Sequence, residues 1–269
     1  MKTSACLLEV SESTFRLKAV YLLVSLWLAL MALASSREAI AAEPIVTWTY
    51  HDFPPFIIDA KKSEGLTFDL VDMLNRRFSG KYAFNLIILP KKRLDSYLQD
   101  GEKGIVLWAP SLAFGGVGNP PYAWTSALLE DRQDFLSLKK KPVDYDGKAS
   151  SLFPYKLGGI LGHNYFGIQD EINKGEIKRE DASSDWANIQ KLLAERVDFI
   201  SIAHSSANYY VGAKNLTGIH FSNMPLNSYT RNILLQSGMS GAQQALNGFI
   251  EKLPNDKEWK GLLAKYSIR

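Results

Sequence analysis

The sequence has almost no cysteine, because Cys6 is the single thiol among 269 residues. Cys6 lies in an N-terminal leader that we expect to be removed, so the mature chain would have no disulfide and no cysteine metal ligand. Histidine is nearly as scarce, and the four residues show no His-Glu-x-x-His spacing. We therefore expect no metal site and no cofactor. The histidines are His51, His163, His204 and His220.

Two further absences narrow the function. The 31 basic and 28 acidic residues are interspersed, and the lack of a basic block argues against nucleic-acid binding. The chain also has no Gly-x-Ser-x-Gly motif of the kind that exposes a nucleophilic serine. We expect a protein that binds a small molecule and is not an enzyme.

The N-terminus has the features of a secretory signal peptide. Arg16 and Lys18 precede an apolar run over residues 19–34, and a small-x-small cleavage pattern follows at residues 39–41. The run is shorter than the roughly 20 residues that span a bilayer, which argues against an uncleaved anchor. We expect residues 1–42 to be a signal peptide, cleaved after Ala41 or Ala42, and the mature protein to reach the periplasm.

The mature chain alternates strand and helix patterns. Strand-like runs at 45–49, 82–89 and 104–109 enclose amphipathic helical patterns over 66–78 and from 91 onward. Such an order predicts an α/β fold with a mostly parallel sheet flanked by helices. A second α/β run begins near residue 156.

The chain leaves the first α/β run near residue 139 and returns to it near residue 225. Two such crossings would join two lobes by a hinge and leave a cleft between them. The predicted lobe I comprises 43–138 plus 225–269, and the predicted lobe II comprises 139–224. The predicted turn at 162–167 leads into a helix that ends near Lys174.

Several short motifs follow one another in a specific order. They are Tyr50-x-x-Phe53-Pro54-Pro55-Phe56, Gly65-Leu66-Thr67-Phe68-Asp69-Leu70, Arg93-x4-Leu98-x2-Gly101, Pro121-Tyr122, Leu157-Gly158-Gly159, Arg196-Val197-Asp198-Phe199 and Lys265-Tyr266. Together they resemble the type 2 periplasmic binding proteins, specifically extracellular solute-binding family 3 of the amino acid ABC transporters. The resemblance covers nearly all of 43–269. It implies a monomer that binds a small-molecule ligand and meets the membrane only through an ABC permease or a membrane-bound sensor.

The amino-acid clamp of that family is missing from this chain. The resemblance implies an arginine shortly after the third strand, yet residues 109–116 contain none. It also implies an acid about five residues beyond Asp198, where the sequence has Ala203 followed by His204. We therefore expect a non-canonical ligand, aromatic or anionic, in place of an α-amino acid.

Candidate ligand-binding residues in the predicted lobe I are mostly aromatic. A box of rings would suit a flat or cationic ligand, whereas the alternative is that the rings fill the core or the hinge. Ser111 lies in the segment that replaces the clamp. Arg93 begins a helix beside two lysines, and it would either hold an anion in the cleft or be solvated. The aromatic candidates with their neighbouring histidine are Tyr50, His51, Phe53, Phe56, Trp108 and Trp124.

The predicted lobe II and the return crossing supply the remaining candidates. His163, Asn164 and Tyr165 lie at a predicted helix N-terminus, where free amides favour an anionic group. His204 would replace the lost acid, and Tyr229 would lie at the hinge, although both could be structural. Two alternative functions remain open. One is a dehydratase-like enzyme using His51 with a carboxylate such as Asp52, and the other is a ligand-free domain for protein contacts.

Overall fold

The computed structural model describes residues 41–114 and 122–268. The predicted signal peptide with Cys6, and Pro121 of the Pro-Tyr motif, lie outside the described residues. The chain divides before Pro44, and the account below concerns the part from there onward. Within the described ranges, no helix is long and apolar enough to cross a membrane.

The first lobe has the predicted β-α-β-α-β order. Strands β1 and β3 are parallel neighbours, and the apolar face of α2, including Leu70 and Met73, is buried against the sheet. The elements are β1 (Glu43–Thr49), α2 (Leu66–Arg77), β2 (Tyr82–Ile88), α3 (Lys91–Gln99), β3 (Ile105–Pro110) and the 3-10 helix η1 (Ser111–Phe114). The periodic apolar spacing in the sequence therefore predicted this lobe correctly.

The second lobe repeats the arrangement around β5, which pairs in parallel with both β6 and β7. Helix α5 begins with a conventional cap, because Ser184 Oγ accepts a hydrogen bond from the Ala187 amide. The elements are η2 (Ala149–Leu152), β5 (Lys156–Ile160), α4 (Gln169–Asn173), β6 (Lys178–Ala182), α5 (Asp185–Leu193), β7 (Phe199–Ala203), α6 (His204–Ala213) and β8 (Ile219–Phe221).

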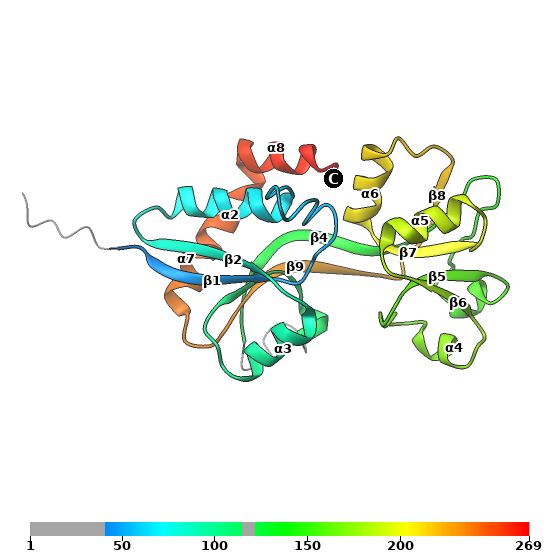
Figure 1. Cartoon of the computed structure of the whole chain (residues 1–269), viewed down its shortest axis with the longest axis horizontal. Helices are drawn as coiled ribbons and strands as arrows, with labels where there is room; N and C mark the ends of the chain where they lie inside the picture. Colours follow the sequence, from blue (N-terminus) through cyan, green and yellow to red (C-terminus); the bar gives the residue numbers. More distant parts are fainter. Residues whose placement is uncertain (1–40, 115–121, 269) are drawn as a thin grey trace, which may run out of the picture. The chain divides into compact units, whose positions relative to one another are not determined.

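Two long antiparallel strands join the lobes (Figure 1). Strand β4 (Ala123–Leu138) pairs with β9 (Asn227–Leu235) up to Gln133 and with β7 from Gln133 onward. The order across the sheet is β2-β1-β3-β9-β4-β7-β5-β6, with β8 added to β4. The sequence patterns predicted two extended segments before a lobe boundary after residue 138. The structure has instead one continuous strand, β4, which changes its partner at Gln133.

Each lobe has its own hydrophobic core. In the first lobe, α2 and the sheet pack with the C-terminal helices, which bury Leu246, Ile250 and Trp259. These helices are α7 (Ser240–Ile250), η3 (Leu253–Asn255) and α8 (Lys257–Lys265). In the second lobe, one cluster lies around Ile200 and another around Phe199, so alternate residues of β7 face opposite sides of the sheet. Two cores joined by two strands confirm the predicted two-lobe α/β class.

The aromatic loop after β1 packs tightly on the start of α2. The amides of Leu66 and Thr67 donate to the Pro55 and Phe56 carbonyls at 2.9 and 3.0 Å. Gly65 precedes them with φ 139°, and a Cβ there would lie 2.4 Å from the Phe56 carbonyl oxygen. Only glycine fits this junction without moving the loop.

We predict that Gly65→Ala lowers the free energy of unfolding by about 2–4 kcal/mol, because it combines a disfavoured φ with a clash against backbone. Gly80→Ala is the matched control, since Gly80 has φ 78° but nothing within 4 Å of the added Cβ. Strain alone should cost that control about 1 kcal/mol. Urea unfolding of both variants measures the difference, and equal losses would show that the loop is not fixed at this point.

Candidate functional site

The chemistry of the crossing region centres on the guanidinium of Arg231 in β9, a residue only 2% exposed. Its Nε donates to Asp131 Oδ2 at 2.7 Å, and one Nη2 hydrogen goes to the Tyr229 hydroxyl at 3.1 Å. Its Nη1 donates to His51 Nε2 at 2.9 Å and to the Trp108 carbonyl at 3.4 Å. One side chain thus connects β9 with β4, β3 and the loop after β1.

Asp131 of β4 is the counter-charge and is equally buried. Its carboxylate accepts hydrogen bonds from the Ser205 amide at 3.1 Å and the Ser205 hydroxyl at 2.8 Å, at the beginning of α6. A carboxylate at a helix N-terminus is favoured by the exposed amides and by the helix dipole. The Asp131–Arg231 ion pair therefore also holds the N-terminus of α6, the helix that follows β7 in the second lobe.

His51 is a neutral side chain held by this ion pair. An arginine can only donate, so His51 Nε2 must accept and the ring proton must lie on Nδ1. Burial of the ring and the charge of Arg231 lower the pKa of His51 well below its usual value. Asp52 is exposed and does not bond to the ring. The arrangement does not provide the His51–Asp52 acid–base pair that the sequence suggested.

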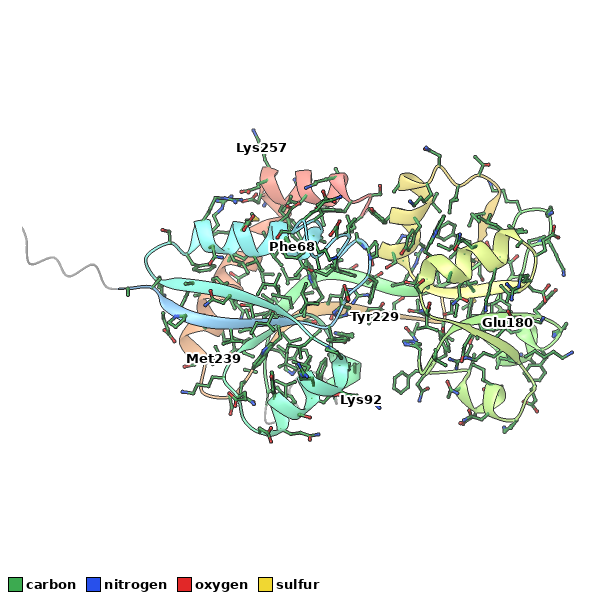
Figure 2. All side chains as sticks on the ribbon, viewed as in Figure 1. Phe68, Lys92, Glu180, Tyr229, Met239 and Lys257 are labelled. Atoms are coloured by element: carbon green, nitrogen blue, oxygen red, sulfur yellow. The ribbon has the colours of Figure 1, made fainter. Side chains whose placement is uncertain are left out.

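The rings of the aromatic loop surround a cation that belongs to the chain itself. The Arg231 Cζ lies 4.6 Å from the centre of the Phe56 ring and 5.2 Å from that of Tyr229. Phe53 packs edge-on against Phe56, and Tyr50 lies against His51 with 4.1 Å between ring centres. Tyr229 lies on β9 where that strand passes between the lobes (Figure 2). Five of the predicted site residues are thus brought together.

Both tryptophans that were predicted to belong to the aromatic box are buried in cores. Trp108 has no exposed surface, and its indole Nε1 donates to Thr67 Oγ1 at 2.9 Å. Its ring is stacked against Trp259, 6.5 Å between centres, in the core beneath α2. Trp124 is 7% exposed and packs against Phe114. Their positions agree with the alternative interpretation, in which these rings fill the core.

The basic residue that approaches the aromatic loop is Lys91 rather than Arg93. Lys91 Nζ lies 4.4 Å from the centre of the Phe114 ring and 5.6 Å from that of Tyr50, and it pairs with Asp95 at 2.5 Å. Arg93 is exposed and forms no ion pair within 41–114 and 122–268. The sequence did contain a signal for Lys91, namely the i,i+4 acid that orients it. Ser111, half-buried, begins η1 directly after β3.

The turn after β5 does not lie at a helix N-terminus, so this prediction was wrong. Helix α4 begins only at Gln169, and it ends at Asn173, close to the end predicted near Lys174. The His163 amide already donates to the Ile160 carbonyl at 2.9 Å, and the Tyr165 amide donates to Gln169 Oε1 at 3.0 Å. These two amides are therefore not free to bind an anion.

Arg179 of β6 holds the same turn. It donates to the Ile160 and His163 carbonyls at 2.6 and 3.1 Å, and Tyr165 is buried beneath it. Burial of His163 and the charge of Arg179 lower the pKa of His163. An open depression of about 430 Å³ lies beside the turn. It is lined by Gly162, His163, Asn164, Gln169, Ile172, Asn173, Arg179 and Asp181.

His204 begins α6 and belongs to a second polar cluster next to the ion pair. Its Nδ1 lies 2.5 Å from Asp134 Oδ2, and its Nε2 lies 2.8 Å from Asn208 Nδ2. Asp134 also accepts from Arg132 Nε at 2.8 Å. The sequence patterns did not identify these charged residues of β4, nor Asp131, as part of the region. The signal that could have indicated them is the presence of charged residues between apolar residues inside a strand, which is unusual.

Asp185, the first residue of α5, is a part-buried acid without a partner among the described residues. Burial raises its pKa to about 7. Burial raises the pKa of Tyr229 to about 12 against the opposing charge of Arg231, and Asp185 is one of three acids that add to the rise. Asp185 is thus a further titratable group of the region near the crossing strands.

No family model and no curated protein matches the sequence. Solved structures do match it. An ancestral arginine-binding protein bound to arginine has a TM-score of 0.62 at 18% identity, covering 83% of this chain and 97% of that one. The GluR0 ligand-binding core from Nostoc punctiforme with L-glutamate has a TM-score of 0.63 at 12% identity, covering 82% and 98%.

A third similar structure is the ancestral amino acid-binding protein AncCDT-1, a precursor of cyclohexadienyl dehydratase. Its TM-score is 0.61 at 16% identity, covering 83% of this chain and 95% of that one. At such identities these matches define the fold. The chain has the two-lobe fold of the type 2 periplasmic binding proteins, as the sequence motifs implied.

We predict that Asp131→Asn lowers the free energy of unfolding by about 3 kcal/mol or more, because it leaves the buried Arg231 guanidinium without a counter-charge. Glu195→Gln breaks the exposed Lys140–Glu195 pair and is the matched control, with a much smaller expected loss because water already screens that pair. Chemical denaturation measures both. Similar losses in the two variants would contradict the central role of the buried pair.

The raised pKa of Asp185 predicts a pH dependence of stability. The folded state holds this proton up to about pH 7, whereas an unfolded aspartate releases it near pH 4, so the contribution of Asp185 to stability falls between those values. Asp185→Asn should therefore be more stabilising, relative to the natural chain, at pH 8 than at pH 4. Denaturation at both pH values tests this, with the exposed Asp72→Asn as control. A difference independent of pH would refute it.

Proposed function

We propose that this protein is an exported solute-binding protein that holds a small ligand between its two lobes. The observation that supports this most directly is the pair of crossing strands, β4 and β9, which join two separately packed lobes. Bending at such strands lets two lobes close around a solute. The similar solved structures carry names of amino-acid-binding proteins, which supports a binding role of the same general kind.

The proposed ligand is anionic or aromatic and is not a conventional amino acid. A carboxylate clamp would require an arginine after β3, and residues 109–114 contain none. A cationic ligand is also disfavoured, because the Arg231 guanidinium already lies against Phe56 and Tyr229. Tyr50 and Phe53 are half-buried and would offer a small aromatic surface to a flat ligand, and Lys91 adds a positive charge beside Tyr50.

We propose that the signal peptide directs the protein to the periplasm, where it acts as a monomer. There it either delivers its ligand to an ABC permease or presents it to a membrane-bound sensor. Residues 43–138 with 225–269, and residues 139–224, would be the two lobes that move against each other. The strand change at Gln133 is where we expect the first crossing to bend.

Two alternatives are weaker. A dehydratase-like enzyme is suggested by the name of one similar structure, a dehydratase precursor. Yet His51 Nε2 is in contact with Arg231, and His204 Nε2 is in contact with Asn208. Neither ring nitrogen is therefore placed for proton transfer to a substrate. A ligand-free domain is favoured by one observation, the occupation of the aromatic loop by Arg231.

A thermal-shift screen of the mature protein tests the binding role. At least one aromatic or anionic metabolite should raise the melting temperature, by an amount that grows with ligand concentration as mass action requires. The standard amino acids should give no shift. A shift with amino acids alone would overturn the proposed ligand class, and no shift with any small molecule would favour the ligand-free alternative.

Two tyrosine variants localise any hit. Tyr50→Ala should weaken binding at least tenfold, because Tyr50 contributes the ring nearest to Lys91 on the aromatic loop. Tyr97→Ala is the matched control, since Tyr97 is an exposed tyrosine on α3. Isothermal titration of both variants gives the affinities. Equal affinities would place the ligand elsewhere.

A further inference from the structure

Arg132 of β4 is held in a fixed orientation by a buried acid. Its Nε donates to Asp134 Oδ1 at 2.8 Å, and the Asp134 side chain is only 3% exposed. The second oxygen of Asp134 lies 2.5 Å from His204 Nδ1, and Asn208 Nδ2 lies 2.8 Å from His204 Nε2. His204 thus holds the carboxylate that positions the guanidinium, and Asn208 holds His204.

The protons of His204 follow from these contacts. The close approach of Nδ1 to the Asp134 carboxylate requires a hydrogen on Nδ1, whichever way the Asn208 amide is oriented. A protonated Nδ1 has no lone pair to accept a further hydrogen. The contact of 3.2 Å between Arg132 Nη2 and His204 Nδ1 is therefore a contact between two donors. Arg132 donates only through Nε.

The outer edge of the Arg132 guanidinium consequently lacks an acceptor within 41–114 and 122–268. The side chain is 45% exposed, so this edge is accessible. Arg76, Arg77 and Arg196 meet carboxylates of the chain through Nη2, in contrast to Arg132. Two parallel Nη–H groups fit the two oxygens of a carboxylate or a phosphate.

Arg132 also lies next to the point where β4 changes its partner strand. It is paired with Ser228 of β9, one residue before Gln133, where β4 changes its partner from β9 to β7. The backbone amide of Arg132 donates to Asp131 Oδ1 at 2.9 Å, so the main chain at Arg132 is bonded to the carboxylate of the buried ion pair. An anion bound here would contact the strand that joins the lobes.

We propose that Arg132 binds the anionic group of the ligand, a carboxylate or a phosphate, in place of the arginine that is missing after β3. The inference rests on the proposed solute-binding function and assigns the charged group of the ligand to β4. Asp134, His204 and Asn208 are positioning residues that orient the guanidinium. The aromatic part of the ligand would lie outside this contact.

The test uses the mature protein with ¹⁵N-labelled arginine and two probes, benzoate and inorganic phosphate. The Nε–Hε signal of Arg132, assigned by its loss in Arg132→Lys, should shift in a saturable manner with at least one probe. The preferred probe distinguishes a carboxylate from a phosphate ligand. A signal that does not move with either probe overturns the proposal.

Affinity measurements give the second arm. Arg132→Gln should weaken binding of the preferred probe, and of any hit from the thermal-shift screen, at least tenfold. Arg76→Gln removes the same charge from an exposed position of α2 that pairs with Glu258, and it should leave affinity unchanged. A hit that binds Arg132→Gln as tightly as the natural chain overturns the role of Arg132 while the solute-binding function stands. Asn208→Ala should weaken probe binding less than Arg132→Gln does, with the Nε–Hε signal retained.

Discussion

The buried ion pair between Asp131 and Arg231 is the constraint on which the crossing region depends. Removing two charges from water is costly, and such a pair is tolerated only when its remaining donors and acceptors are satisfied. Here the carboxylate is satisfied by Ser205 and by the Arg132 amide. The guanidinium is satisfied by His51, Tyr229 and the Trp108 carbonyl. Because these partners come from the loop after β1, from β3, β4, β9 and from α6, the pair links elements of both lobes.

The same ion pair occupies the inner face of the aromatic loop. A loop of rings after the first strand has the composition of a site for a flat or cationic molecule, yet its inner face packs against Arg231. Burial and then the charge of Arg231 lower the pKa of His51, so its ring is neutral. What remains for a ligand is the outer edge, where Tyr50, Phe53 and Lys91 are part-exposed.

The order of strands and helices was predictable because burial repeats with the period of each element. The α2 pattern from Leu66 is buried as its spacing requires. Side-chain directions at irregular positions were not predictable. Trp108 lies within β3 at a register shift and has φ 63°, an irregularity that no periodicity reveals, and its ring lies in the core. Asp131 and Arg231 are one hundred residues apart, so their pairing could not be read from local pattern.

In the role proposed for Arg132, one strand serves both stability, through Asp131, and recognition. Neighbouring residues of a strand point to opposite faces, so the acid turns inward to Arg231 while the arginine remains accessible. The inner contact holds β4 against β9 and α6. The outer contact, through Asp134 and His204, holds the guanidinium without neutralising its outer edge. A solute recognised there would act on a strand whose position is already set by the buried pair. Binding and lobe closure would then share the same few residues of β4.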